Sequence, residues 1–382
     1  MHGRGDNETG SGMRLACGCA LVIFAGIIRA PNASAAELEL RIENPPTNGT
    51  VMALLFNSAS TFVALRDPVT VVTLPSVGAM PGRIAGLPAG DYALVVYADA
   101  NGNGRLDKNF IGIPREPLGF SNRYWPQGPP SFTRAAFRLE ADETKAFDVE
   151  LRSIFGKAGR LGLGAGVIAQ TSPYRDSKPV RVQPIPVITY LGDRVQILGP
   201  AALCGISKWG DVGLAATASY RMGAYDDDDS AYLQGMGSRN DTLMGGLAVQ
   251  ADLPLGFAFS AGYEHDLLDV IGGGNGRLGV EKAFQRGPLT VSPQLTLNWL
   301  TADLADYEYG VPVDKTAEGR PAYQPGDAVS LEGGVNLFIE LSGAWRIILN
   351  ANVTRLPSEL TASPIVDQAW VSSGFAAVNR LL

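Results

Sequence analysis

The sequence predicts an all-β protein with two parts: an N-terminal Greek-key, prealbumin-like β-sandwich, then an antiparallel transmembrane β-barrel of roughly 12 strands. Three observations predict this fold class. Long runs alternate strictly between apolar and polar residues, the apolar content is dispersed along the chain, and the connections between the runs alternate in length. A barrel needs all three, because lipid contacts one face of each strand and the ladder must close on itself.

The clearest alternating run is 289–299, in which Leu289, Val291, Leu295, Leu297 and Trp299 share one face. The same period returns over 329–341 and 347–353. Runs of about ten residues suit a tilted strand that crosses a bilayer. Strands of soluble sandwiches are usually about five or six residues long. The length of these runs therefore favours a membrane barrel, with the apolar face toward outer-membrane lipid.

Composition agrees with this fold and excludes several functions. Hydrophobic residues make up 46% of the 382 residues and charged residues 18%, yet the mean hydropathy is only +0.06. Beyond the N-terminal region no apolar run is long enough for a membrane-spanning helix. A net charge of −7 and a pI near 5.0 argue against nucleic acid as a partner. We find no spacing typical of a nucleotide, zinc or haem site.

Residues 1–36 are predicted to be an export signal, with Met13 as a candidate start. Arg14 precedes an apolar stretch over 15–28, and small residues at 33–36 provide a cleavage site before Glu37. A membrane anchor is the alternative, although about 14 apolar residues are too few to span a bilayer. We therefore expect an exported chain located in the outer membrane of a Gram-negative type of cell, with its N-terminal domain in the periplasm.

The region 37–154 is expected to form the β-sandwich, and 155–159 a linker. Apolar residues alternate with charged ones over 38–43, 137–140 and 147–152. Tyr92 follows Pro88-Ala89-Gly90-Asp91, a pattern typical of a tyrosine corner, in which the Tyr hydroxyl bonds a nearby backbone group. Tyr92 is thus predicted to be structural.

The barrel is expected to occupy 160–382. Its predicted strand cores are 160–169, 182–191, 193–199, 201–207, 211–221, 242–252, 255–265, 276–284, 289–299, 328–340, 344–354 and 368–379. Most odd-numbered connections are long and the even-numbered ones short, as in outer-membrane barrels with long outer loops and short periplasmic turns. The connection 199–201 breaks the pattern, because it should be long and is short.

Polar residues on the inner face of the predicted strands would face the lumen: Gln294, Asn298, Glu332, Asn336, Glu340, Arg346, Asn350 and Asn352. Two interpretations stay open, a water-filled solute path and a lumen plugged by hydrogen-bonded side chains. Aromatic residues near the strand ends are expected to form a girdle at the lipid headgroups: Tyr263, Trp299, Tyr307, Tyr309, Trp345 and Trp370.

A calcium loop is the candidate metal site. Asp99, Asn101, Asn103 and Asp107 occupy positions one, three, five and nine of a calcium-loop pattern. Position twelve lacks the usual Glu, and Glu116 is a candidate substitute. The alternative is an Asx-rich loop that bonds only its own backbone.

An outer-membrane lipid hydrolase is the enzymatic alternative. It would have to use His265, since the only other histidine lies in the predicted leader. No Gly-x-Ser-x-Gly motif accompanies His265. We therefore expect a non-enzymatic protein.

The region 158–382 resembles the MipA/OmpV family of outer-membrane proteins. The segments that carry the resemblance are 184–190, 233–236 with Arg239, Asp241 and Thr242, 306–311, 323–326 and 363–366. The resemblance implies a barrel, and one family member is described as a scaffold that links peptidoglycan-synthesising and peptidoglycan-cleaving enzymes. The region 37–154 is similar to a small secreted bacterial family of unknown function, through Asp-x-Asn-x-Asn-Gly-x-x-Asp at 99–107.

These expectations define two hypotheses. In the first, the barrel anchors a periplasmic module and, through it, peptidoglycan synthases or lytic enzymes. In the second, the protein is a small-solute channel of the outer membrane.

Overall fold

The computed structural model describes residues 35–74, 81–156, 158–341 and 344–382. The predicted leader lies almost wholly outside these ranges. The described part of the chain is mainly β-structure, which confirms the predicted fold class. None of its helices has both the length and the apolar character needed to cross a membrane.

The N-terminal domain consists of two sheets. Strands β4 (Gly82–Leu87), β1 (Ala36–Ile42) and β8 (Thr144–Val149) form the first sheet in that order. The second sheet has the order β3 (Thr70–Leu74), β2 (Thr50–Phe56), β5 (Gly90–Asp99) and β6 (Leu118–Phe120), and β7 (Phe137–Leu139) also pairs with β5. Side chains of both sheets form one buried core, which includes Leu38, Leu40, Leu55, Leu94 and Val96.

Strands β2 and β5 are buried on both faces, so they lack the alternation seen in β1. Their second face carries Leu54, Phe56 and Val95 and packs against Phe62 of α1 (Ala59–Ala64). The same core includes Ala135 of α2 (Phe132–Ala135). A short 3-10 helix, η1 (Ser121–Arg123), precedes α2. A central strand covered on both sides is expected to be continuously apolar.

The tyrosine corner predicted at Tyr92 is present. The Tyr92 hydroxyl donates a hydrogen bond of 3.0 Å to the carbonyl oxygen of Pro88. The ring is buried and packs against Phe137, with ring centroids 6.4 Å apart. The hydrogen bond closes the β4–β5 turn onto the core.

Among the described residues, twelve strands follow one another around the wall of the barrel, as the sequence predicts. In order these are β9 (Arg160–Thr171), β10 (Val180–Leu191), β11 (Val195–Leu198), β12 (Ala201–Trp209), β13 (Val212–Arg221), β14 (Thr242–Asp252), β15 (Phe257–Asp266), β16 (Gly274–Lys282), β18 (Leu289–Leu300), β19 (Ala328–Glu340), β20 (Trp345–Arg355) and β21 (Trp370–Leu381). All neighbours are antiparallel, and β21 pairs with β9 to close the ring. The short β17 (Phe284–Arg286) continues the wall beyond β16 and pairs with β18.

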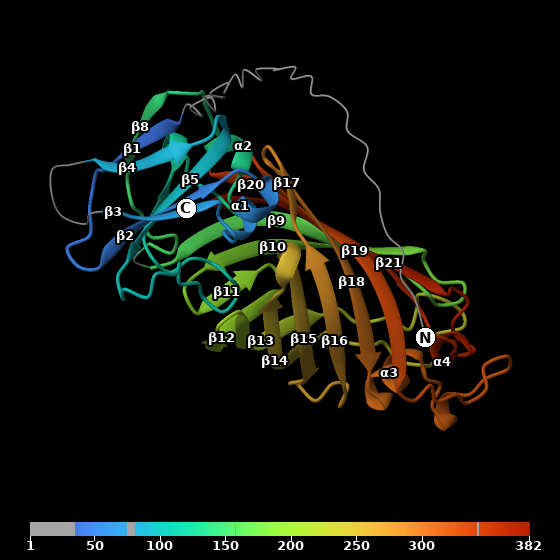
Figure 1. The fold of residues 1–382 in the computed structure, drawn as a ribbon. Helices are drawn as coiled ribbons and strands as arrows, with labels where there is room; N and C mark the ends of the chain where they lie inside the picture. The colour runs from blue at the N-terminus through green and yellow to red at the C-terminus, as the bar shows by residue number, and fades with distance from the viewer. Residues whose placement is uncertain (1–34, 75–80, 157, 342–343) are drawn as a thin grey trace, which may run out of the picture. The chain divides into compact units, whose positions relative to one another are not determined.

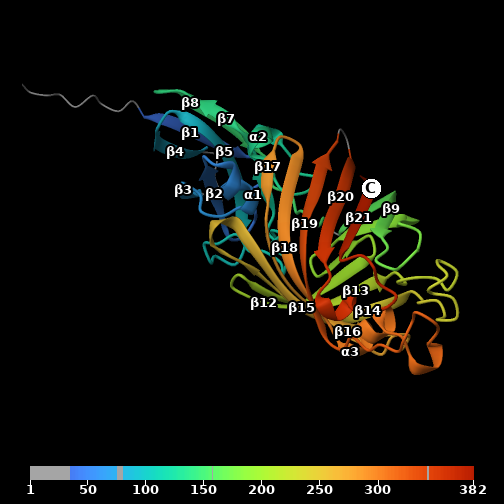
Figure 2. The ribbon, with the colours of Figure 1, turned by 90° about the vertical axis from the view of Figure 1, so that its right-hand side faces the viewer.

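Short turns join the strands at one end of the barrel, and long loops join them at the other, except for the short connection between β11 and β12 at Gly199 and Pro200. A short 3-10 helix, η2 (Pro254–Gly256), lies in one of the turns. The loops carry α3 (Ala302–Tyr309), η3 (Val313–Lys315) and α4 (Ser358–Thr361), and Figures 1 and 2 show α3 and α4 at the loop end. The sequence had predicted these segments as loops only.

The outer face of the barrel is aliphatic. Leu278, Leu295, Leu331 and Val353 are each between 45% and 51% exposed, whereas polar residues alternate with them on the inner face. Burial in hydrocarbon explains why these residues are apolar without being in a protein core.

Of the six aromatic residues expected in a girdle, four lie on strands of the barrel and two do not, so the girdle stays a prediction for those four and is wrong for the other two. Tyr263, Trp299, Trp345 and Trp370 are exposed on strands of the barrel. Tyr307 and Tyr309 instead lie in α3, where Tyr309 is buried among loop residues. The alternation rule does not apply to them, because they belong to a helix that folds back over the lumen.

Candidate functional site

A cavity of about 410 Å³ lies inside the barrel beneath the long loops. Its lining includes polar residues of β16, β18, β19 and β20, among them Asn275, Asn298, Glu332 and Asn350. This volume is within the range of small-molecule sites in proteins. We take this cavity as the candidate functional site.

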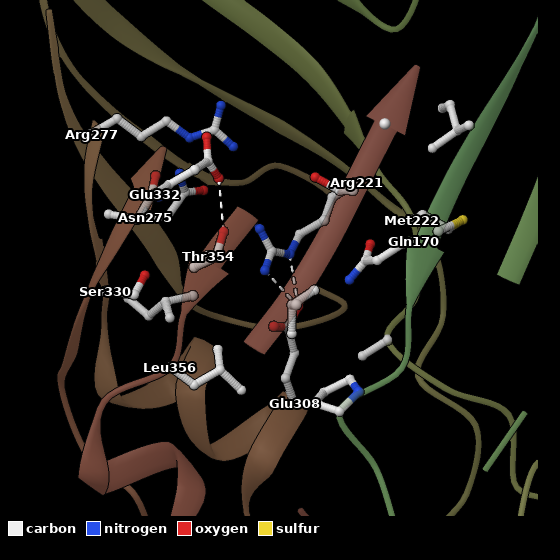
Figure 3. A pocket seen from close by; sticks show the side chains of 18 of the residues that line it. Gln170, Arg221, Met222, Asn275, Arg277, Glu308, Ser330, Glu332, Thr354 and Leu356 are labelled. Carbon is white, nitrogen blue, oxygen red and sulfur yellow. Dashed lines mark hydrogen bonds and ion pairs between the residues drawn. The ribbon is translucent and has the colours of Figure 1, made fainter. Parts of the chain in front are cut away.

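An ion pair spans the upper part of the cavity. Arg221, at the outer end of β13, donates from Nε to Glu308 Oε1 at 2.8 Å, and its Nη2 lies 2.7 Å from the same oxygen. Glu308 lies on α3, so the pair connects a loop helix to the barrel wall (Figure 3). The Tyr174 hydroxyl donates to the Glu308 carbonyl oxygen at 3.2 Å and connects the β9–β10 loop to the same helix.

The charges that line the cavity are balanced. Two arginines and two glutamates contribute to the lining, namely Arg221, Arg277, Glu308 and Glu332. Glu332 accepts a hydrogen bond of 3.1 Å from Thr354, and Arg277 extends toward Glu332 from the neighbouring part of the wall (Figure 3). The cavity therefore suits a neutral or zwitterionic group better than a strongly charged one.

Three of the eight residues predicted to face the lumen line this cavity: Asn298, Glu332 and Asn350. Four amides join in a network along β18, β19 and β20. Gln294 donates to Asn352 at 2.9 Å, Asn336 donates to Gln294 at 3.2 Å, and Asn350 donates to Asn336 at 2.7 Å. Such a network satisfies polar groups inside the barrel without water.

Arg346 and Glu340 belong to the inner end of the barrel, away from the cavity lining. Arg346 donates to Asn379 Oδ1 at 2.8 Å and to Thr189 Oγ1 at 2.5 Å, and all three side chains are buried. Buried and bonded in this way, Arg346 is a bridge between β20, β21 and β10.

Glu340 binds the N-terminal domain, a role that sequence patterns gave no means to foresee. It accepts a hydrogen bond of 2.6 Å from Arg134 Nη1, and the backbone N–H groups of Gln127 and Gly128 donate to it at 3.1 and 3.2 Å. Arg160, at the start of β9, donates to the Gln127 side chain at 2.9 Å. The segment 126–134 therefore contacts the inner end of the lumen.

Further contacts connect the N-terminal domain to the short turns of the barrel. Arg66 binds Asp211 of the β12–β13 turn at 2.6 Å and Asp252, the last residue of β14, at 3.0 Å. Arg115 binds Asp193 at 2.8 Å, and Ser131 donates to the Gly287 carbonyl oxygen at 2.9 Å. These contacts extend from the β10–β11 turn to the β17–β18 turn.

Lys108 fixes one of the segments that contact the turns. Its Nζ donates to the carbonyl oxygens of Ala64 and Leu65, at 2.8 and 3.3 Å, at the C-terminal end of α1. Burial lowers the pKa of Lys108 from 10.5 to about 8.

The long loops pack into a hydrophobic core at the outer end of the barrel. Its buried members include Tyr174, Tyr225, Leu233, Leu304 and Ile365, which come from four different loops. Arg239 strengthens it, because its guanidinium lies 4.9 Å from the ring centroids of both Tyr225 and Tyr307. Burial raises the pKa of the Tyr309 hydroxyl, as expected in an apolar environment.

The candidate calcium loop bonds its own backbone. Asp99 accepts hydrogen bonds from the N–H groups of Gly102, Asn103 and Gly104, at 2.8, 3.1 and 2.7 Å. The side-chain amides of Asn101 and Asn103 both donate to Asp107. Across the described residues, no group of three or more His, Cys, Asp and Glu side chains is placed to hold a metal ion. This geometry is that of the Asx-rich alternative, and calcium binding stays a prediction.

Glu116, the candidate substitute for the missing Glu, bonds the backbone of the loop, and its role as a ligand stays a prediction. Its two carboxylate oxygens accept hydrogen bonds from the N–H groups of Ala100 and Asp107, at 3.2 and 3.0 Å. Burial raises the pKa of Glu116.

His265 lies on β15, where its Nδ1 is 3.1 Å from the Tyr263 hydroxyl and its ring stacks on Tyr263. These contacts place it among aromatic residues of the barrel wall.

A closed antiparallel barrel with an aliphatic outer face, a polar inner face and long loops at one end defines an outer-membrane β-barrel protein. The barrel lies in the outer membrane, and the short turns face the periplasm. The chain belongs to the MipA family, because the model described as "MltA-interacting protein MipA" matches residues 163–381. Residues 41–146 match a second family, described as an uncharacterised protein conserved in bacteria.

Three curated relatives illustrate the similarity. The MltA-interacting protein of Escherichia coli (strain K12) is 30% identical over 217 residues, which are 56% of this chain and 86% of the relative. The putative outer membrane protein YiaT of the same strain is 28% identical over 214 residues, 55% of this chain and 86% of the relative. Outer membrane protein OmpV of Vibrio cholerae is 29% identical over 159 residues, 41% of this chain and 61% of the relative.

The segments that carried the family resemblance in the sequence build the loop core. Leu233 and Met236 are buried in it, and so are Tyr309, Val311 and Val366. Ser363 donates to the Tyr309 carbonyl oxygen at 2.5 Å and joins two of these segments. What the chain shares with the family therefore includes the structure that covers the outer end of the lumen.

Proposed function

We propose that this protein is a non-enzymatic anchor, whose barrel holds a periplasmic domain at the outer membrane for contact with peptidoglycan enzymes. The observation that carries the proposal is that protein contacts cover the lumen at both ends of the barrel. The loops form a hydrophobic core at one end, and Glu340 binds the segment 126–134 at the other. A barrel built in this way favours rigid display of a domain over passage of solutes.

The relatives indicate which class of partner to test. One of them is named for its interaction with MltA, and the matched residues are 86% of its length, which leaves too little chain for a domain of the size of 36–149. That interaction would then be a property of the shared barrel. In this chain the N-terminal domain contacts the periplasmic turns itself, so a partner would have to contact this domain.

The test is capture of purified MltA by the immobilised protein in detergent. The full chain is compared with a chain that lacks 36–149, which corresponds to the length of the relatives. We expect the full chain to retain several-fold more MltA than the shortened chain, whose uncovered turns can provide only the contact that the shorter relatives would use. If both retain MltA equally, the domain is not the contact surface. If neither retains it, the anchor proposal for this class of partner is wrong.

A further inference from the structure

We propose that the barrel wall has a lateral opening at the level of the outer leaflet, through which the acyl chain of a neutral or zwitterionic single-chain amphiphile enters the central cavity. This inference goes beyond the anchor function and does not depend on it. The first observation is an incomplete ladder along β10. This strand pairs with β9 along its whole length, from Val180 to Leu191, but with β11 only from Thr189 to Leu191. No described strand pairs with its other edge from Val180 to Val187.

The cause of the incomplete ladder is the short β11–β12 hairpin. β11 has only four residues, and the hairpin ends at Gly199 and Pro200. The N–H group of Gly199 donates to the Ile188 carbonyl oxygen at 3.1 Å, and beyond this point no strand of the described residues pairs with β10 on that side. This is the short connection that broke the loop pattern in the sequence.

Two prolines fit this unpaired edge. Backbone groups alternate between the two edges of a strand, so the even-numbered residues of β10 share the edge to which the Ile188 carbonyl points. Pro184 and Pro186 are therefore on the unpaired edge, where a missing N–H group costs no ladder hydrogen bond. An unpaired N–H group in hydrocarbon is destabilising, so proline, which has no N–H group, suits a strand edge that faces lipid.

The unpaired edge lies between the two aromatic levels of the barrel. By strand register, Ile188 is level with Leu163, Arg380 and Trp345. At the other end of the same sheet, Arg181 is level with Gln170 and Ser373, three residues from Trp370. Val182 and Ile188 are 63% and 48% exposed on the outer face of β10. The medium that borders this edge is therefore the acyl region of the membrane.

Side chains bridge the opening where a ladder is missing. Gln183 donates to the Tyr220 hydroxyl at 3.4 Å, and Tyr220 donates to Asp241. Arg181 donates to the Gly223 carbonyl oxygen at 3.0 Å and to Asp226 at 2.9 Å. Rotation of side chains can open such a closure without breaking a strand pairing.

The opening leads into the central cavity. A hollow of about 610 Å³ is lined by Arg181, Gln183, Asp241 and Met222, and Met222 also lines the central cavity (Figure 3). Tyr220 and Pro200, which border the opening, line the central cavity as well.

The cavity is amphipathic in the direction of the opening. Apolar residues near it are Ile168, Pro200, Met222 and Phe375, and the Phe375 ring lies within 3.5 Å of the position that a Cβ atom on Gly199 would take. Of the charged lining residues, Arg277 and Glu332 lie on β16 and β19, several strands away from β10 around the ring, whereas Arg221 of β13 and Glu308 of α3 lie closer to the loops. An acyl chain would therefore lie against the apolar residues beside the opening, and a head group would contact the balanced charges, which are Arg277 and Glu332 of the far wall and the Arg221–Glu308 pair.

The test uses p-benzoylphenylalanine, a photo-crosslinking residue, at single positions of the full-length protein. The protein is placed in phosphatidylcholine vesicles that contain lysophosphatidylcholine, and lipid adducts are identified by mass spectrometry. The test positions are Ile185, on the inner face of β10 beside the opening, and Ile168 in the cavity. The matched control is Ile348, on the inner face of β20, which has strand partners on both sides. Leu297, exposed on the outer face, is the positive control.

We expect lysolipid adducts at Ile185 and Ile168, roughly tenfold or more above Ile348, because hydrocarbon does not reach behind a continuous ladder. Tyr220→Phe removes the hydroxyl that bridges Gln183 and Asp241 and should raise the yield at Ile168. Tyr190→Phe, on β10 at its paired end and bonded to Ala158, should not. Absence of lipid adducts at both Ile185 and Ile168 would overturn the opening. If Ile185 forms adducts with the diacyl phosphatidylcholine while Ile168 forms none with either lipid, the acyl chain does not enter the cavity and that part of the proposal is wrong. A heat-modifiability gel verifies that each variant is folded, and Ile168 alone suffices if Ile185 does not tolerate substitution.

Discussion

The contact between Arg134 and Glu340 should control how firmly the N-terminal domain is held on the barrel. The Glu340 side chain is 2% exposed and the Arg134 side chain 37%, and their closest N–O distance is 2.6 Å. Removal of one partner from a buried pair costs about 3–5 kcal/mol. Because Arg134 is partly exposed, solvent screening lowers this value, and we expect about 2 kcal/mol for Arg134→Ala.

The assay is limited proteolysis of the full-length protein in detergent, with cleavage followed within 126–134. When opening is fast relative to cleavage, the rate follows the population of the open form. A loss of about 2 kcal/mol should raise the cleavage rate about 30-fold, since each 1.4 kcal/mol is a factor of ten. The double variant Arg134→Ala/Glu340→Gln should be cleaved more slowly than Arg134→Ala alone, because it leaves no stranded buried carboxylate.

Arg138→Ala is the matched control. Arg138 pairs with Asp91 and Glu140 on the surface, where it is 60% exposed. An exposed pair contributes at most about 1 kcal/mol, so cleavage should change only a few-fold. If Arg134→Ala changes cleavage no more than Arg138→Ala does, the contact does not hold the domain and the reasoning is refuted.

Three further predictions concern the N-terminal domain, and pulse proteolysis in urea measures its stability in the first two. Tyr92→Phe should destabilise it by about 1 kcal/mol through loss of the hydrogen bond to Pro88, and no change would show that the corner is not structural. The folded-state pKa of Lys108, about 8, lies below its ordinary value of 10.5, so the unfolded chain binds more protons between these values. Stability should therefore rise from pH 8 to 10.5, and Lys108→Met should remove this rise, whereas an unchanged pH profile would refute it. Calorimetry with millimolar calcium should detect heat if the loop at Asp99 binds the ion. Only this heat decides the question, because Asp99→Ala lowers the melting temperature in either case by stranding three N–H groups.

Much of the barrel could be predicted from the sequence because lipid imposes a simple rule. Each strand must present apolar residues at every second position, so runs such as 289–299 reveal both their length and their faces. The strand observed there, β18 (Leu289–Leu300), differs from the predicted core by one residue. The alternation of loop lengths independently predicted which end of the barrel carries the short turns and which carries the long loops.

The remaining features depend on contacts between distant segments, which no local period encodes. Tyr309 resembles a girdle residue in sequence but lies in a helix that packs on other loops. Glu340 satisfies the alternation of an inner-face residue, yet its partner Arg134 is 206 residues away. The continuous burial of β2 and β5 also results from elements that cover a second face, and sequence alone does not show which elements these are.

The acidic run 226–229 also depends on contacts with distant segments. Four consecutive carboxylates by themselves indicate a solvated, self-repelling loop. In the structure Asp226 binds Arg181 at 2.9 Å, and Asp229 lies 3.7 Å from Lys178. Cations from another loop and strand compensate the charge.

Single-channel recording in planar bilayers tests the central claim most directly. An anchor whose lumen is covered by the loop core at one end and by the segment 126–134 at the other should not conduct ions steadily. The full-length protein should show no sustained conductance, and Arg134→Ala, which loosens only the inner end, should add brief events at most. A steady open conductance of the unmodified protein would contradict the claim and would establish the small-solute channel in its place.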